Sequence, residues 1–84
     1  MLSSKLQKVS NEIRDKLKSG GVPARYVSVT CHNESNVEFI NIRIVKGMET
    51  KLPNGEMLFF YVAKLVDDMK SKYNNSHFSI NWVN

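Results

Sequence analysis

Apolar residues recur at helical spacing near the start of the chain. Leu2, Leu6, Val9, Ile13 and Leu17 follow one another at intervals of four, three, four and four residues. This spacing is typical of an amphipathic helix with one buried face. Ser4 and Gln7 predict a capping box at the start of the helix, and Gly20-Gly21 with Pro23 predict its end.

Two alternating stretches follow this first helix. Residues 24–32, "ARYVSVTCH", place Val27, Val29 and Cys31 on one face, and residues 36–47, "NVEFINIRIVKG", do the same with Ile40, Ile42 and Ile44. Strict alternation predicts strands with one buried face. The four residues between them, "NESN" (33–36), are turn formers, so the two strands are expected to form a β-hairpin.

The second half of the chain predicts a loop, a helix and a closing strand. Residues 47–55, "GMETKLPNG", are rich in helix and strand breakers. Helical spacing then returns in Phe59, Val62, Val66, Met69 and Tyr73 and predicts a helix over about 56–73. Taken alone, "LFFYV" (58–62) also suits a strand, so helix and strand both stay open there. Residues 77–84, "HFSINWVN", alternate as a strand after the break at "NNS".

The expected order α-β-β-α-β predicts an α+β fold in a single domain over residues 1–84. Two helices packed on one face of a three-stranded, mostly antiparallel sheet would bury every apolar face together. The last strand is expected beside the first, which gives the spatial order 2-1-3 and an all-antiparallel sheet. Placement beside the second strand, parallel to it, is the alternative.

The sheet face opposite the helices is the candidate binding surface. It is expected to collect Tyr26, Ser28, Thr30, Phe39, Asn41, Arg43, Ser79 and Asn81. We take as candidate binding residues Tyr26, Thr30, Phe39, Asn41, Arg43 and Asn81. The solvent side of the first helix, which is rich in lysine and arginine, is the competing surface.

Composition narrows the class of protein. With 42% hydrophobic and 24% charged residues, the chain is typical of a globular domain. It contains no apolar run long enough for a transmembrane helix and no signal-peptide pattern. A single cysteine fits a reducing compartment, so a cytoplasmic location without membrane association is expected. The net charge of +4 favours acidic partners.

No pattern in the sequence indicates catalysis. Cys31 and His32 are neighbours on an expected strand and would point to opposite faces, so they do not form a nucleophile–base pair. Asp67 and Asp68 diverge on a helix. No cysteine, histidine or carboxylate spacing completes a metal site, and no glycine-rich phosphate loop precedes a helix. We therefore expect no enzyme, no catalytic residue, no metal and no cofactor.

Two kinds of partner suit the exposed sheet face. A protein partner is favoured because a partly aromatic sheet face is a common docking surface, and a homodimer would bury Phe39 and Tyr26. The alternative is RNA or single-stranded nucleic acid, whose bases stack on exposed aromatic side chains. The chain lacks the ribonucleoprotein-type motif of one such fold.

The segments "IRDKLKSGG", "RYVSVT" and "NVEFINIRIVKG" resemble a small domain family of phages and mobile elements, one of the large-polyvalent-protein-associated domains. The matching positions, in the first half of the chain, are Arg14, Leu17, Lys18, Val27, Val29, Ile42, Ile44 and Gly47. A tryptophan is common in the second strand of that family, whereas Arg43-Ile44-Val45 stands here. The resemblance implies a phage or mobile-element setting and an inhibitor or adaptor of a host or defence complex, without catalytic residues.

Overall fold

The computed structural model describes residues 3–83 and has the order α-β-β-α-β. The elements are α1 (Ser4–Ser19), a short 3-10 turn η1 (Ala24–Tyr26), β1 (Val27–Glu34), β2 (Val37–Ile44), α2 (Leu58–Tyr73) and β3 (Phe78–Val83). The predicted α+β class and element order are confirmed. Within residues 3–83, no helix is long and apolar enough to cross a membrane.

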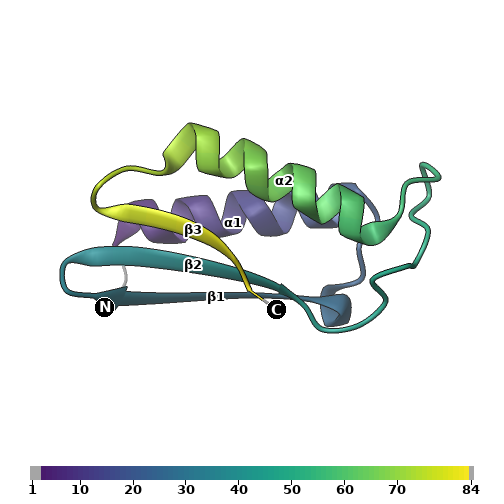
Figure 1. Ribbon diagram of the computed structural model, residues 1–84, viewed down its shortest axis with the longest axis horizontal. Helices are drawn as coiled ribbons and strands as arrows, with labels where there is room; N and C mark the ends of the chain where they lie inside the picture. The colour runs from purple at the N-terminus through teal and green to yellow at the C-terminus, as the bar shows by residue number, and fades with distance from the viewer. Residues whose placement is uncertain (1–2, 84) are drawn as a thin grey trace.

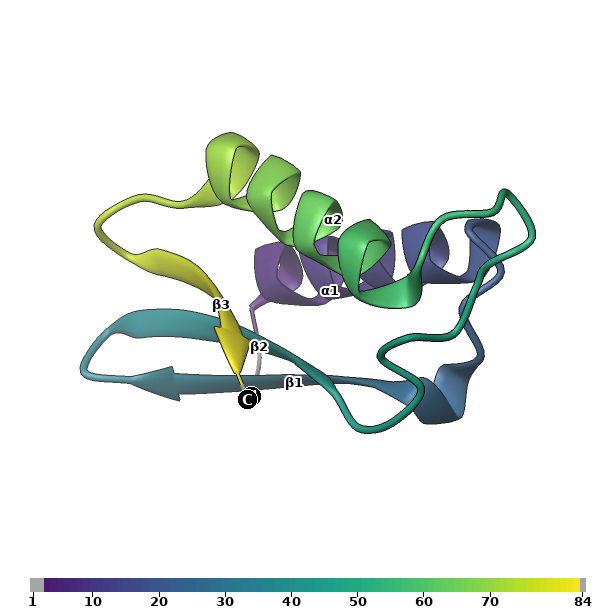
Figure 2. The same ribbon diagram turned by 45° about the vertical axis from the view of Figure 1, so that its right-hand side comes forward.

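The molecule has two layers, a three-stranded sheet and a pair of helices on one side of it (Figure 1). The helices lie side by side and run in opposite directions, and the turned view keeps both on the same side of the sheet (Figure 2). The core between the layers contains Leu6, Val9, Ile13, Leu17, Val22, Val27, Ile40, Ile42, Leu52, Leu58, Val62, Leu65, Val66, Met69, Phe78 and Ile80.

The first helix buries the stripe that its spacing predicts. Leu6, Val9 and Ile13 are fully buried, while Leu2 of the same stripe lies outside the described residues. The predicted cap is wrong by one residue: Ser3, not Ser4, accepts a hydrogen bond from the backbone N–H of Leu6 through its side chain. A serine hydroxyl accepts a hydrogen bond from one of the unpaired amides of the first turn. Ser3 and Ser4 both carry such a hydroxyl, so the sequence does not distinguish between them as the cap.

The hairpin is tighter than the four-residue turn that the sequence predicts. β1 continues to Glu34, and only Ser35 and Asn36 connect it to β2. Both have positive φ angles, 52° and 68°, as a type I′ turn requires. Two-residue turns of this type match the twist of paired strands, so Asn33 and Glu34 remain in the ladder.

The segment that suited either a helix or a strand is helical from Leu58 onward. Met57 is the N-cap residue, and the loop before α2 supplies acceptors to the first turn. The amide of Leu58 donates to the carbonyl of Thr50, and that of Phe59 donates to the carbonyl of Met48. Because the loop satisfies these orphan amides, the helix begins two residues later than predicted.

The preferred strand order is wrong and the alternative is correct. The sheet has the order β1-β2-β3, in which β1 and β2 are antiparallel and β3 runs parallel to β2. The sixteen residues of α2 span about 24 Å, close to the length of β2, so the helix returns the chain to the start of that strand. α1 contacts both β1 and β2, and α2 contacts β3, which lies beside β2.

A polar contact joins the two helices. The Glu12 carboxylate of α1 accepts hydrogen bonds from the Tyr73 hydroxyl at 2.6 Å and from the Lys72 ammonium at 3.2 Å, both on α2. The Tyr73 hydrogen bond, followed by the contact with Lys72, holds the pKa of Glu12 below its ordinary value of 4.5. The contact therefore contributes stability above the unfolded pKa, and this contribution is lost as pH falls through the folded pKa.

We expect Glu12→Gln to lower the melting temperature at neutral pH and to have less effect in acid. The difference between wild type and Glu12→Gln is expected to shrink as pH falls from the ordinary carboxyl pKa of 4.5 through the lower pKa of Glu12 in the folded protein. Thermal unfolding followed by circular dichroism from pH 3 to 7 measures it. Tyr73→Phe removes the hydroxyl donor and is expected to reduce the same pH dependence. A difference that stays constant with pH would contradict this account.

Candidate binding face

Nine side chains form three rows on the sheet face turned away from the helices. The rows follow from the register of the strands, in which each β2 residue pairs with one residue on either side. They are His32–Phe39–Ser79, Thr30–Asn41–Asn81 and Ser28–Arg43–Val83. Side chains alternate along a strand. Of the intervening residues of β2 and β3, Ile40, Ile42 and Ile80 are buried and Trp82 is half-buried against the core. We call these nine residues the open face.

An aromatic pair lies at one end of the open face. The rings of His32 and Phe39 stack with centroids 4.8 Å apart and an angle of 14° between their planes. The Nδ1 of His32 lies 3.4 Å from the Nδ2 of Asn41, and its Nε2 lies 3.8 Å from a carboxylate oxygen of Glu34. The stack covers part of Phe39, which is half-buried, and holds the imidazole against the centre of the sheet.

The row through Asn41 and the row through Arg43 consist mainly of polar side chains, and Arg43 is the one charged residue in them. Thr30, Asn41 and Asn81 lie side by side across the three strands, and the Ser79 hydroxyl donates to the Asn81 side-chain oxygen at 3.2 Å. Arg43 is exposed beside Val83, which is also exposed. Among the nine residues Arg43 is the single permanent charge, and the Glu34 carboxylate lies beside His32 at the hairpin end, so between them the face presents mainly hydrogen-bonding groups.

Tyr26 lies beyond the open face. It ends η1, one residue before β1, and its carbonyl accepts from the amide of Val45 at 2.8 Å. Its ring lies against Gly47, where an added Cβ would come within 2.6 Å of it. The guanidinium of Arg25 lies 5.2 Å, and the ammonium of Lys46 5.7 Å, from the ring centroid. Tyr26 is therefore part of a small cationic cluster at the sheet end nearest Arg43.

The structure brings five of the six candidate residues onto one surface: Thr30, Phe39, Asn41, Arg43 and Asn81. The sequence analysis missed His32 as a member of this face. The sequence does indicate this position, because His32 is two residues from Thr30 and four from Ser28, and side chains at such spacings on a strand point to the same face. The sequence places His32 on the expected strand, opposite Cys31, but the candidate face predicted from it leaves His32 out.

In the part of the chain that the structure describes, few cysteine, histidine or carboxylate side chains lie close together. Cys31 is half-buried on the helix side of β1, and His32 is on the other side, as their adjacency predicts. Among residues 3–83, no group of three histidine, cysteine or carboxylate side chains is placed to hold a metal ion. The open face presents stacked rings, amides and hydroxyls.

Comparison with known proteins gives no match to a family model, to a curated protein or to a solved structure.

Proposed function

We propose that this protein is a non-enzymatic binding domain that docks its open face on a protein partner. The observation that carries the proposal is the composition of the face, nine residues without lysine or carboxylate around a stacked His32–Phe39 pair and Arg43, with the Glu34 carboxylate only at the hairpin end beside His32. Centres of protein interfaces are depleted in lysine and acidic residues and enriched in aromatic residues and arginine. The amides of Asn41 and Asn81 supply hydrogen bonds without the desolvation cost of a charge.

A low charge density favours protein over nucleic acid as the partner. Nucleic-acid binding draws most of its affinity from phosphates neutralised by several lysine and arginine residues. The open face offers Arg43 alone for that purpose. The stacked pair and the amides suit a protein surface without such neutralisation.

Single-stranded nucleic acid is the second candidate, and one observation favours it. Arg25 and Lys46 flank the ring of Tyr26, so that with Arg43 three cations lie at the same end of the sheet. A strand that passed its phosphates over this end could stack bases on Phe39 and His32.

The resemblance to a phage and mobile-element domain family supports a role as an adaptor or inhibitor of a host or defence complex. Such proteins act by covering a surface of another protein, which fits a domain of 9.6 kDa.

We expect Arg43→Glu to abolish capture of the partner and Lys8→Glu to leave it unchanged. Both variants reverse one exposed positive charge, but Lys8 is on the solvent side of α1. A hot-spot arginine contributes about 2 kcal/mol or more, so capture by Arg43→Glu is expected to fall by more than tenfold. Affinity capture from lysate, quantified by mass spectrometry for both variants and wild type, measures the difference.

The opposite pattern, loss with Lys8→Glu and retention with Arg43→Glu, would move the binding surface to α1. Recovery of nucleic acid alone, with affinity that falls steeply as salt rises, would favour the second candidate. Proteins captured equally by all three chains would contradict docking through the open face.

A further inference from the structure

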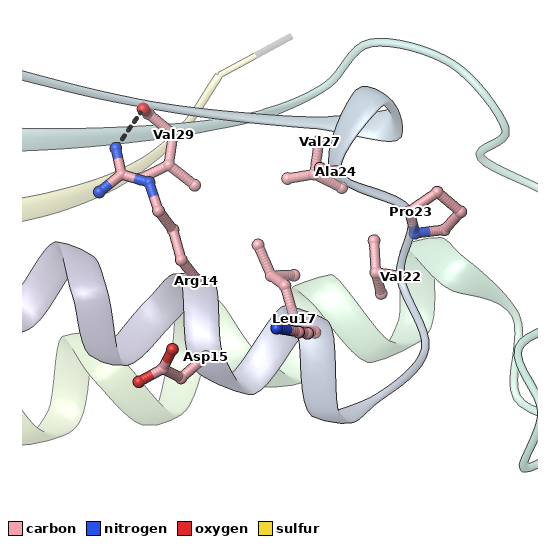
Figure 3. A pocket seen from close by; sticks show the side chains of 9 residues that line it. Arg14, Asp15, Leu17, Val22, Pro23, Ala24, Val27 and Val29 are labelled. Atoms are coloured by element: carbon pink, nitrogen blue, oxygen red, sulfur yellow. Dashed lines mark hydrogen bonds between the residues drawn. The ribbon is translucent and has the colours of Figure 1, made fainter.

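A groove separates α1 from the free edge of β1, on the side of the molecule away from α2 and β3 (Figure 3). It has a volume of about 540 Å³, and its apolar walls come from both elements and the segment between them. Leu17 and Val22 line it from one side, while Val27 and Val29 point into it from β1. We call it the edge groove.

β1 is an edge strand because the sheet has the order β1-β2-β3. In an antiparallel pair, alternate residues direct their backbone groups toward the neighbouring strand and away from it. The carbonyl of Tyr26 accepts from the amide of Val45 beyond the end of β2, which sets the phase of this alternation. The N–H and C=O groups of Val27, Val29 and Cys31 therefore point outward, along the rim of the edge groove. Such a row is a template for a further strand.

Arg14 links α1 to this edge. Its guanidinium donates to the carbonyl of Val29 at 3.1 Å and to the hydroxyl of Ser10, which is buried, at 3.2 Å. A guanidinium carries five N–H donors, so others remain for a carboxylate. Arg14 covers one carbonyl of the edge. The groove lies beneath it at the rim of the core, where Leu17, Val22 and Val27 are only 6–7% exposed and Val29 is half-buried.

The charge around the edge groove favours an acidic ligand. Arg14 and Lys18 line it, and so does Asp15, whose carboxylate points away from β1. The side that faces β1 therefore carries the guanidinium, and the whole chain carries a net charge of +4.

We propose that the edge groove binds an extended, acidic segment of a partner protein, which adds to β1 as a fourth strand. The main chain of the segment bonds to the outward groups of Val27 and Cys31 and to the amide of Val29, whose carbonyl already accepts from Arg14. Its alternate apolar side chains enter the groove, and a carboxylate side chain pairs with Arg14. Recognition by strand addition draws affinity from the backbone and specificity from pockets for alternate side chains. This site is separate from the open face and does not depend on it.

The test starts from a display library of octapeptides, selected for binding to the protein, in which valine, isoleucine or leucine alternate with serine, threonine or glutamate. The most enriched sequence is synthesised and titrated into the ¹⁵N-labelled full chain. We expect a Kd of about 1–100 µM, as for other short peptides bound along one strand. In the complex, the amides of Val27, Val29 and Cys31 are expected to exchange with solvent at least about tenfold more slowly. The amides of Ser28 and Thr30, which already point toward β2, are expected to change little.

Three variants and one altered peptide complete the test. Val29→Lys places a charge in the groove and is expected to weaken binding more than tenfold, whereas Thr30→Lys, the next residue on the opposite face, keeps the affinity. Lys18→Glu, on the exposed side of α1, is expected to weaken binding of the glutamate-containing peptide severalfold without touching the core. Proline at a central position of the peptide removes a ladder donor and is expected to abolish binding.

Any of four results would overturn the proposal. They are no octapeptide enriched over the unselected pool, equal binding of the proline-containing peptide, protection of Ser28 and Thr30 in place of their odd-numbered neighbours, or peptide signals confined to the open face. Arg43→Glu is expected to bind the octapeptide normally, so failure here is distinct from failure of the open-face proposal.

Discussion

Ile40→Ala is expected to destabilise the domain more than any other single change discussed above. Ile40 is fully buried in β2, the central strand, and pairs with Cys31 on one side and Ile80 on the other. Truncating such a side chain costs about 2–5 kcal/mol, because the surrounding core fills the cavity only in part. For a small domain this is a large share of the total stability, which is typically about 5–15 kcal/mol. Urea unfolding followed by circular dichroism measures the loss.

Asn41→Ala is the matched control, since Asn41 is the next residue of the same strand and lies on the open face. Its removal is expected to change the free energy of unfolding by less than about 1 kcal/mol, as for most surface changes. The pair of variants tests which face of the sheet is covered by the helices. Equal losses at both positions would contradict the assignment of an open face.

Gly47→Ala is expected to destabilise the protein by about 2–3 kcal/mol, the sum of a backbone cost and a steric clash. Gly47 has a φ angle of +74°, where an L-residue is strained. An added Cβ would also come within 2.6 Å of the Tyr26 ring and 2.9 Å of the Thr50 hydroxyl. The ring would have to leave its place between Gly47 and the cations of Arg25 and Lys46.

Gly55→Ala separates these two costs. Gly55 has a φ angle of +86°, yet no atom lies within 4 Å of its added Cβ. This variant is expected to lose only the backbone cost of about 1 kcal/mol. Chemical unfolding of both variants gives the cost of displacing Tyr26 as the difference, and proton NMR of the Tyr26 ring reports the displacement. Equal losses in the two variants would show that the ring is not held by Gly47.

The buried positions were predictable because each apolar face is periodic. Leu6, Val9 and Ile13 repeat at helical spacing, and Ile40 and Ile42 alternate, so a slip of one residue would expose the whole set. The boundaries were less predictable, since they depend on single hydrogen bonds. The choice between Ser3 and Ser4 as cap is an example, because both offer the same hydroxyl.

The candidate site followed from the same alternation, but its internal contacts did not. The alternation of side chains along the two strands is enough to place Thr30, Phe39, Asn41 and Arg43 on one face. The stack of His32 on Phe39 depends on the two-residue turn, which extends the ladder far enough to pair these residues. Tyr26 lies outside the face because it belongs to η1, a short turn that no periodic pattern in the sequence predicts.

By itself, the sequence determined the first helix, the three strands and the apolar face of each, because these follow from local spacing and the free energy of burying apolar side chains; for residues 58–62 it left helix and strand open. Only the tertiary structure decided which strand lies beside β3, that β1 has a free edge, and that Arg14 meets that edge over a groove. Either strand order buries the same apolar faces and runs the strands in the same directions. The choice depends on how α1 and α2 share the area above the sheet, which is a property of packing between distant segments.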